Sequence, residues 1–134
     1  MPPKIIINTS NFKKGGALQV AVSFVPSQLK SIVNLGKTKH SIILKELSKA
    51  EFFIFPSLLE TVGLGLIEAA SSECKILAAD LPYVREVVTP SLFFNPNSPE
   101  DIAKAVKKAL KGGHPNPKIL LPNRIEEFVN LLTK

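Results

Sequence analysis

Two glutamates, Glu60 and Glu68, stand on either side of the glycine-rich segment Gly63-Leu64-Gly65. An aromatic run precedes this segment and an apolar run follows it, which predicts that a strand gives way to a helix. The free amides and the positive dipole end of a helix start can hold an anion such as phosphate, and glycine lets a ligand approach the backbone closely. Glu68, one turn into the helix, can accept hydrogen bonds from a vicinal diol such as that of ribose. The spacing favours a ligand with a phosphate and a diol, with Glu60 facing its other side.

These carboxylates also have an ordinary interpretation. Glu68 fits an exposed helix face, and Glu60 fits a loop beside a helix N-terminus, where the dipole favours negative charge. A second glycine pair, Gly15-Gly16, follows the β-branched run Ile5-Ile6-Ile7 and a polar turn. A two-glycine loop is a weak phosphate signal with a plain turn as its alternative, and only the strand-to-helix context favours a ligand loop. From the residues alone, both interpretations stay open.

The composition is that of a globular domain. The 134 residues are 45% hydrophobic and 21% charged, and no apolar run approaches the roughly 20 residues of a membrane helix. The N-terminus lacks the apolar core and cleavage site of a secretory signal, so we expect a cytoplasmic protein. Cys74 is the only cysteine and the two histidines lie far from it, which argues against a disulfide or a zinc site. A net charge of +6 is compatible with phosphorylated small molecules, anionic lipid or nucleic acid.

Alternating strands and helices are expected to position these residues. Hydrophobic periods and turn residues predict strands over 4–7, 31–36, 52–55, 75–79 and 91–94, and helices over 17–25, 42–47 with Ser41 as its cap, 64–72, 82–88, 102–111 and 124–132. This alternation predicts an α/β fold with a single Rossmann-like, doubly wound parallel sheet in which 52–55 is a central strand. Ligands of such sheets bind beyond the carboxyl ends of the strands, where residues 56–62 leave the central one.

The helix over 102–111 has the clearest boundaries. Ser98 is a favourable N-cap, Pro99 suits the first helical position, and Gly112 suits the position after the end. The lysines at 104, 107, 108 and 111 share the face opposite the apolar stripe. We interpret them as a solvated face, with a phosphate-binding or membrane-surface patch as the alternative. Peripheral contact with a membrane therefore stays open, without a transmembrane segment.

Several of these residues resemble a known family. The matching positions are Pro56-Ser57, Glu60, Gly63-Leu64, Glu68-Ala69, Ala79-Asp80-Leu81-Pro82 and Arg85-Glu86-Val87. Over residues 32–110 they resemble the C-terminal donor-binding domain of family 4 retaining glycosyltransferases (glycosyl transferases group 1), which have the GT-B fold. Separately, the first strand and Gly15-Gly16 look like the start of the same enzymes' N-terminal domain.

The resemblance implies a site for a nucleotide-diphosphate sugar, used as the donor without a metal or other cofactor. It assigns the catalytic position to Glu60 and the ribose to Glu68. Thr61, Val62, Gly63 and Leu64 would contact the sugar and diphosphate, and the loop of Gly15 and Gly16 would approach the diphosphate.

The chain also departs from the family. It holds hardly more than one of the two domains of a GT-B enzyme. Residues 26–31, between the two resembling parts, look like the scar of an internal deletion, so we expect 1–31 to be a remnant of the N-terminal domain and 32–134 to be the Rossmann-like nucleotide-sugar-binding domain. The family's basic pair and its acceptor-domain histidine have no counterpart that can be placed. Glu73 and Lys75 stand where the family commonly has glycine and proline.

These points lead to one main expectation with alternatives. We expect a glycosyltransferase-like protein of polysaccharide or lipopolysaccharide biosynthesis, with its donor site partly retained and inactive alone unless a partner chain completes the cleft. The alternatives are a nucleotide-sugar-binding module without turnover and a non-functional gene remnant. Nucleic-acid binding ranks below these, because the positive charge is scattered and no tryptophan is present.

Overall fold

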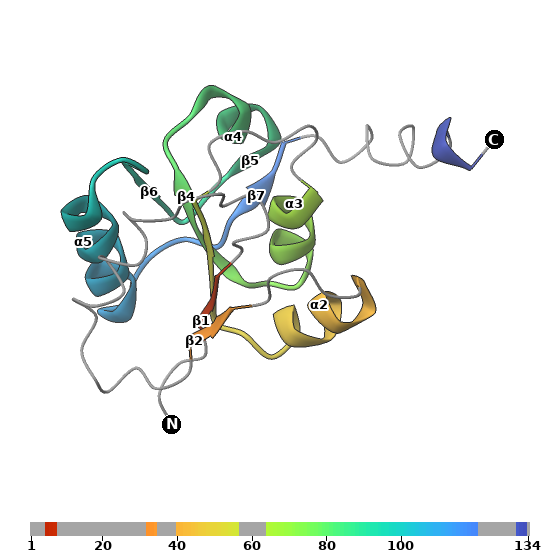
Figure 1. Ribbon diagram of the computed structural model, residues 1–134, viewed down its shortest axis with the longest axis horizontal. Coiled ribbons are helices and arrows are strands. Elements are labelled where there is room, and N and C mark those ends of the chain that lie inside the picture. Colours follow the sequence, from red (N-terminus) through yellow and green to blue (C-terminus); the bar gives the residue numbers. More distant parts are fainter. Residues whose placement is uncertain (1–4, 8–31, 35–39, 57–63, 121–130, 134) are drawn as a thin grey trace.

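A computed structural model describes residues 5–7, 32–34, 40–56, 64–120 and 131–133 (Figure 1). Within these ranges five parallel strands form one sheet in the order β2-β1-β3-β4-β6. The strands are β1 (Ile5–Ile7), β2 (Ile32–Asn34), β3 (Phe52–Phe55), β4 (Lys75–Ala79) and β6 (Leu92–Phe94). Continuous β-branched and aromatic runs suit a parallel sheet that is buried on both faces. The expected doubly wound α/β sheet is confirmed, and β3 is its central strand.

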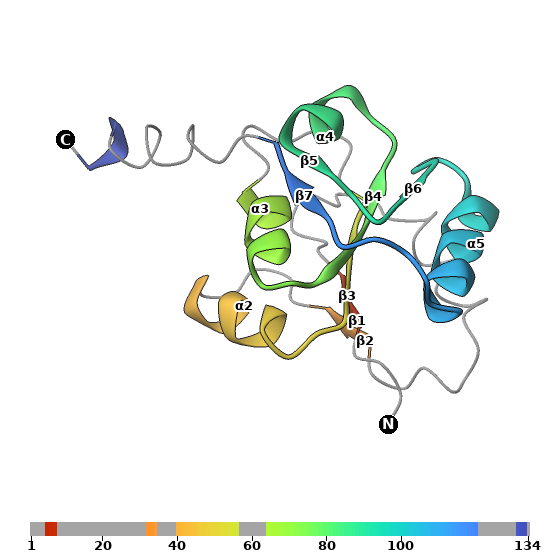
Figure 2. The ribbon, with the colours of Figure 1, turned by 180° about the vertical axis from the view of Figure 1, so that it is seen from behind.

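Helices cover both faces of the sheet (Figures 1 and 2). Helix α5 (Pro99–Leu110) packs on one face, with Ile5, Ile7 and Phe94 in the core beneath it. The other face contacts α2 (His40–Leu47), α3 (Leu64–Ser71) and α4 (Pro82–Val87). Successive side chains of a strand point to opposite faces, so Ile6 joins this second core while its neighbours join the first.

The starts of α5 and α2 differ in how well the sequence predicts them. The Ser98 side chain accepts a hydrogen bond from the Asp101 amide at 3.2 Å, and Pro99 occupies the first turn, which confirms the predicted start of α5. Helix α2 begins at His40, so Ser41 lies inside it and the prediction that Ser41 caps it is wrong. Apolar spacing constrains the middle of a helix better than its ends, which explains this error.

A small antiparallel ribbon was not expected from the sequence. Strand β5 (Val88–Thr89) pairs with β7 (Lys118–Ile119), and the Leu120 amide donates to the Val87 carbonyl at 2.9 Å. Val88 is fully buried and Ile119 packs against the same core, so the ribbon closes the side of the molecule near α3. Two-residue strands are too short to show an alternating pattern, and the sequence therefore gives no signal for them.

The end of α3 has the hydrogen bonds of a Schellman cap. The Cys74 amide donates to the Ala69 carbonyl at 3.0 Å and the Glu73 amide to the Ala70 carbonyl at 3.1 Å. Glu73 adopts a φ of 59°, in the left-handed region that glycine favours. The Lys75 amide donates to the Glu51 carbonyl at 2.9 Å, a bond that proline could not make. Both departures from the family pattern therefore lie where the backbone defines how α3 leads into β4.

Some predictions fall outside the described residues. They are the helix over 17–25 and all of the helix over 124–132 except Leu131 and Leu132, which are helical. The division of the chain at residue 31 stays a prediction, and β1 lies between β2 and β3 in the same sheet. Among the described helices, none has the length and apolar character needed to cross a membrane.

Candidate functional site

The strand order reverses between β1 and β3. From β1 the chain moves outward to β2, and it then returns past β1 to form β3, β4 and β6 on the other side. In open α/β sheets, ligands bind in the crevice outside the carboxyl ends of the strands at such a reversal. Ile7 of β1 pairs in register with Ile54 of β3. The segments that follow these two strands therefore begin side by side at this edge.

Most of the predicted site residues belong to these two segments. Gly15 and Gly16 come after β1, and Glu60, Thr61, Val62 and Gly63 come after β3. All six lie outside the described residues, so their placement stays a prediction. The described strands β1 and β3 end next to each other, so both segments start from the same edge of the sheet.

Leu64 and Glu68 are the predicted site residues that the structure describes. Leu64 is the first residue of α3, and Glu68 lies one turn further along and is half-buried. Leu66 and Ile67 are buried against the sheet and fix the orientation of the helix. The first turn of α3 has no acidic residue, so no side chain of that turn neutralises the positive dipole end. The start of α3 is thus suited to binding an anion, and the helix presents the carboxylate of Glu68 one turn further along.

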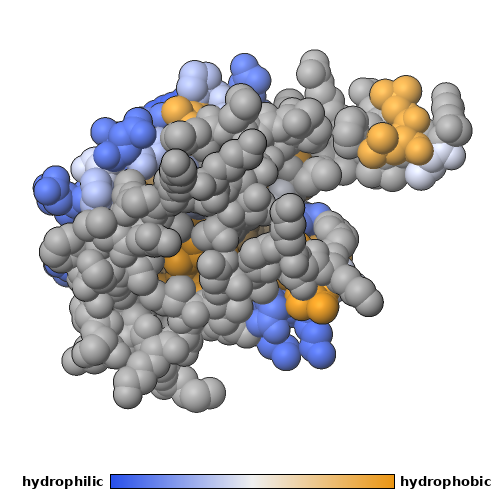
Figure 3. Space-filling view, in the orientation of Figure 1, coloured by the Kyte–Doolittle hydropathy of each residue, from blue (hydrophilic) through white to orange (hydrophobic). Residues whose placement is uncertain are grey.

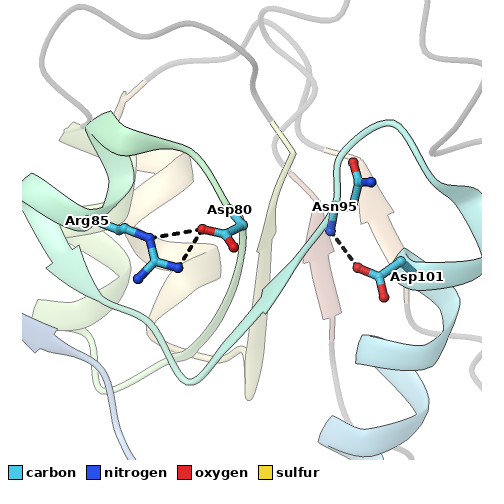
Figure 4. Close-up of polar contacts among 4 residues, drawn as sticks. All are labelled: Asp80, Arg85, Asn95 and Asp101. Carbon is cyan, nitrogen blue, oxygen red and sulfur yellow. Dashed lines mark hydrogen bonds and ion pairs between the residues drawn. The ribbon is translucent and has the colours of Figure 1, made fainter.

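A second polar cluster lies where β4 and β6 end (Figure 4). Arg85 of α4 donates to one oxygen of Asp80, with Nε at 3.0 Å and Nη2 at 2.7 Å from Oδ1. The guanidinium carbon of Arg85 is 4.3 Å from the ring centre of Phe93, a cation–π contact. Both Asp80 and Arg85 match the family pattern, but the resemblance assigns neither of them a role. Their contact depends on the arrangement of three elements, which the local sequence does not reveal.

An open hollow of about 310 Å³ adjoins this cluster. Asp80, Phe93, Phe94, Asn95, Pro96 and Asp101 line it. The backbone amide of Asn95 donates a hydrogen bond to Asp101 Oδ2 at 2.6 Å, so this carboxylate closes the turn between β6 and α5 (Figure 4). Among the residues that the structure describes, two carboxylates and no basic side chain line the hollow, which makes it unfavourable for a diphosphate. The edge of the sheet where β1 and β3 end is a more favourable site for an anionic ligand.

Cys74 is not a candidate nucleophile. Its thiol is buried behind α3, and this burial raises its pKa from 9.0 to about 12. The thiolate is the reactive form of cysteine, and at neutral pH this side chain is a thiol. Cys74 therefore serves as a small apolar side chain in the core.

Comparisons with curated proteins give enzymes that transfer mannose. Over 100 residues the chain is 29% identical to the O-antigen chain mannosyltransferase RfbU of Salmonella typhimurium, covering 71% of this chain and 26% of that protein. Over 64 residues it is 36% identical to the serotype-specific mannosyltransferase WbdA of Escherichia coli, covering 47% of this chain and 8% of that protein. The chain thus spans about a quarter or less of the length of these relatives.

The fold and the family agree with these similarities. The sucrose-phosphate synthase of Thermosynechococcus elongatus superposes with a TM-score of 0.65 at 19% identity, covering 81% of this chain and 36% of that one. At this identity the likeness concerns the fold, which is that of a GT-B domain. The family model for glycosyl transferases group 1 matches residues 28–127. The match covers most of the chain, which therefore belongs to the glycosyl transferases group 1 family.

Proposed function

We propose that the chain is a nucleotide-sugar-binding unit of a retaining glycosyltransferase that builds O-antigen or a related polysaccharide. The observation that carries this proposal is the reversal of strand order between β1 and β3. The two segments that contain the glycines leave β1 and β3 at the same edge of the sheet, and α3 begins directly after the second segment. The mannosyltransferase relatives support a mannose-bearing donor.

Each part of the donor has a proposed partner at this edge. The diphosphate lies at the start of α3, near Gly63 and Leu64, with Gly15 and Gly16 approaching from the segment after β1. Glu68 accepts hydrogen bonds from the ribose diol. Glu60, together with Thr61 and Val62, contacts the sugar. The half-buried position of Glu68 supports this assignment, because partial burial strengthens hydrogen bonds to a charged acceptor.

The chain is proposed to bind the donor weakly when alone. A ribose diol on Glu68 contributes about two charge-assisted hydrogen bonds of roughly 1.5–3 kcal/mol each, and helix-start amides add on the order of 1 kcal/mol. Association costs at least about 4 kcal/mol, and a lone domain leaves the ligand open to water. We therefore expect a dissociation constant no lower than about 1 mM, or roughly −4 kcal/mol.

Sugar transfer is proposed to need a partner chain or domain. Stabilising the departing diphosphate is usually the largest contribution to such a reaction. Arg85, the one arginine among the described residues, is already paired with Asp80. This pairing favours a unit that binds the donor without turnover until a partner supplies further cationic groups.

A chemical-shift titration with nucleoside diphosphates and nucleotide sugars, including mannose donors, tests the site. We expect perturbations at residues 63–68 and weaker binding by Glu68→Ala. Glu51→Ala is the matched control, because this exposed glutamate precedes β3 at the opposite edge of the sheet. Micromolar affinity, or shifts confined to α5, would show that the site or the ligand is wrong. Turnover of a radiolabelled donor by the chain alone would contradict the proposed need for a partner.

A further inference from the structure

The outer face of α5 carries four lysines that the proposed donor site does not use. Lys104, Lys107 and Lys108 of α5 and its C-cap residue Lys111 follow one another at intervals of three, one and three residues. This spacing places them along one side of the helix. All four are exposed, while Ile102, Ala105, Val106 and Ala109 are buried against the sheet. Hydrophilic residues are visible at the upper left of the molecule, on the side where α5 lies (Figures 1 and 3). We name the four residues the lysine stripe.

The lysine stripe is not neutralised by nearby acids. Glu100 and Asp101, the acidic residues of α5, both lie in its first turn. Asp101 accepts a hydrogen bond from the Asn95 amide at 2.6 Å, so it is engaged away from the lysines. Among the described residues no ion pair reaches any of the four ammonium groups. Glu100 stands four residues before Lys104 without forming an ion pair with it, and no acid stands three or four residues from Lys107, Lys108 or Lys111.

We propose that the lysine stripe is the surface by which the protein lies on an anionic phospholipid bilayer. Four or more lysines on an amphipathic helix are attracted to the negative charge of anionic lipids. The buried side of α5 is held on the sheet, so its charged side can lie along a membrane without exposing the core. No large apolar side chain of α5 is strongly exposed, and the attachment is therefore electrostatic and reversible.

This surface is separate from the proposed donor site. Helix α5 covers the opposite face of the sheet from α3, which carries Glu68. Loss of membrane attachment should therefore leave nucleotide-sugar binding unchanged. The attachment to a membrane does not depend on the proposed function. Its purpose does, because the attachment would hold the donor-binding unit near a lipid-linked acceptor.

Co-sedimentation of the full chain with vesicles tests the proposal. One set contains phosphatidylglycerol and phosphatidylcholine, and the other contains phosphatidylcholine alone. We expect binding to the first set only, weakening as salt is raised because the charges are screened. Each lysine near an anionic surface strengthens binding about fivefold. The double variant Lys104→Glu, Lys108→Glu should therefore weaken the partition at least about 25-fold.

A matched variant separates the lysine stripe from net charge. Lys45→Glu, Lys49→Glu changes the charge of the molecule equally, but these exposed lysines lie on or just after α2, on the other sheet face. We expect it to retain most of the binding. Equal losses in the two variants, binding to phosphatidylcholine alone, or binding insensitive to salt would overturn the proposal. Tighter binding to duplex DNA than to anionic vesicles at the same salt would also overturn it. If the glutamate variant fails to fold, Lys104→Gln, Lys108→Gln replaces it, with Lys45→Gln, Lys49→Gln as its control.

Discussion

At the residue scale, Glu73 is a local source of strain. Its φ of 59° lies in the left-handed region, where a residue with a Cβ costs roughly 1–2 kcal/mol. The two hydrogen bonds of the Schellman cap keep it there. Glu73→Gly should therefore raise the free energy of unfolding by about 1 kcal/mol, as measured by urea denaturation, after part of the gain is offset by the flexibility of glycine in the unfolded chain.

Glu73→Ala is the control for this prediction. It removes the same charge but keeps the Cβ, so the backbone strain remains and no comparable gain is expected. A glycine variant that is no more stable than the alanine variant would show that the left-handed backbone is not the cause. The family's preference for glycine at this position follows from the same conformation.

Cys74 makes a prediction about alkaline stability. Burial raises the pKa of its thiol to about 12 in the folded protein, against an ordinary value of 9.0. Above pH 9 the unfolded chain loses this proton while the folded chain keeps it, so stability falls as pH rises through this window. The slope from one such group is at most about 1.4 kcal/mol per pH unit. Urea denaturation at several pH values, compared with Cys74→Ala, should show that this part of the slope disappears in the variant.

At the element scale, Ser98 stabilises the start of α5. Its hydroxyl accepts a hydrogen bond from the Asp101 amide, one of the donors that a helix start leaves without a partner. Ser98→Ala should lower the free energy of unfolding by about 1 kcal/mol. Urea and thermal denaturation measure this change. Asn97→Ala alters the exposed residue before Ser98 and should lower the free energy of unfolding less. Equal effects of the two changes would mean that the cap contributes little.

The contact of Arg85 with Asp80 and Phe93 attaches α4 to the ends of two strands. Because Asp80 and Arg85 are 48% and 57% exposed, the ion pair is worth only about 0.2–1 kcal/mol. A double-mutant cycle of Asp80→Asn and Arg85→Gln should give a coupling free energy within this range that falls at high salt. A coupling near zero at low salt would show that α4 is held by its buried Val84 and Val87 instead.

The sequence predicts which segments form strands and helices better than it predicts which of these elements lie next to each other. The runs at Phe52–Phe55 and Lys75–Ala79 are long and apolar enough to identify strands, and Ser98 with Pro99 identifies a helix start. The β5–β7 ribbon has too few residues to produce a pattern. Periodicity also says nothing of which strands pair. The contact between Asp80 and Arg85 likewise appears only when β4, α4 and β6 are assembled.

At the scale of the whole molecule, the position of β1 inside the sheet bears on the predicted domain boundary at residue 31. It pairs with β2 on one side and β3 on the other, and Ile5, Ile6 and Ile7 are at most 3% exposed. Ile6 belongs to the core under α3 and α4, while Ile5 and Ile7 belong to the core under α5. An interior strand of this kind stabilises both layers at once. Residues 5–7, which the resemblance assigns to a remnant of another domain, are thus part of the sheet.

This position predicts the result of shortening the chain to residues 32–134. Loss of β1 would leave β2 and β3 without their common neighbour, and it would open cavities in both cores. Replacing one buried isoleucine by alanine already costs about 2–5 kcal/mol, against a total stability of roughly 5–15 kcal/mol for a domain. We therefore expect the shortened chain to show no cooperative unfolding by circular dichroism, and Ile6→Ala to be far less stable than Ile42→Ala, which changes an isoleucine that is 44% exposed. Cooperative unfolding of residues 32–134 would instead support a domain boundary at residue 31 and a sheet that closes without β1.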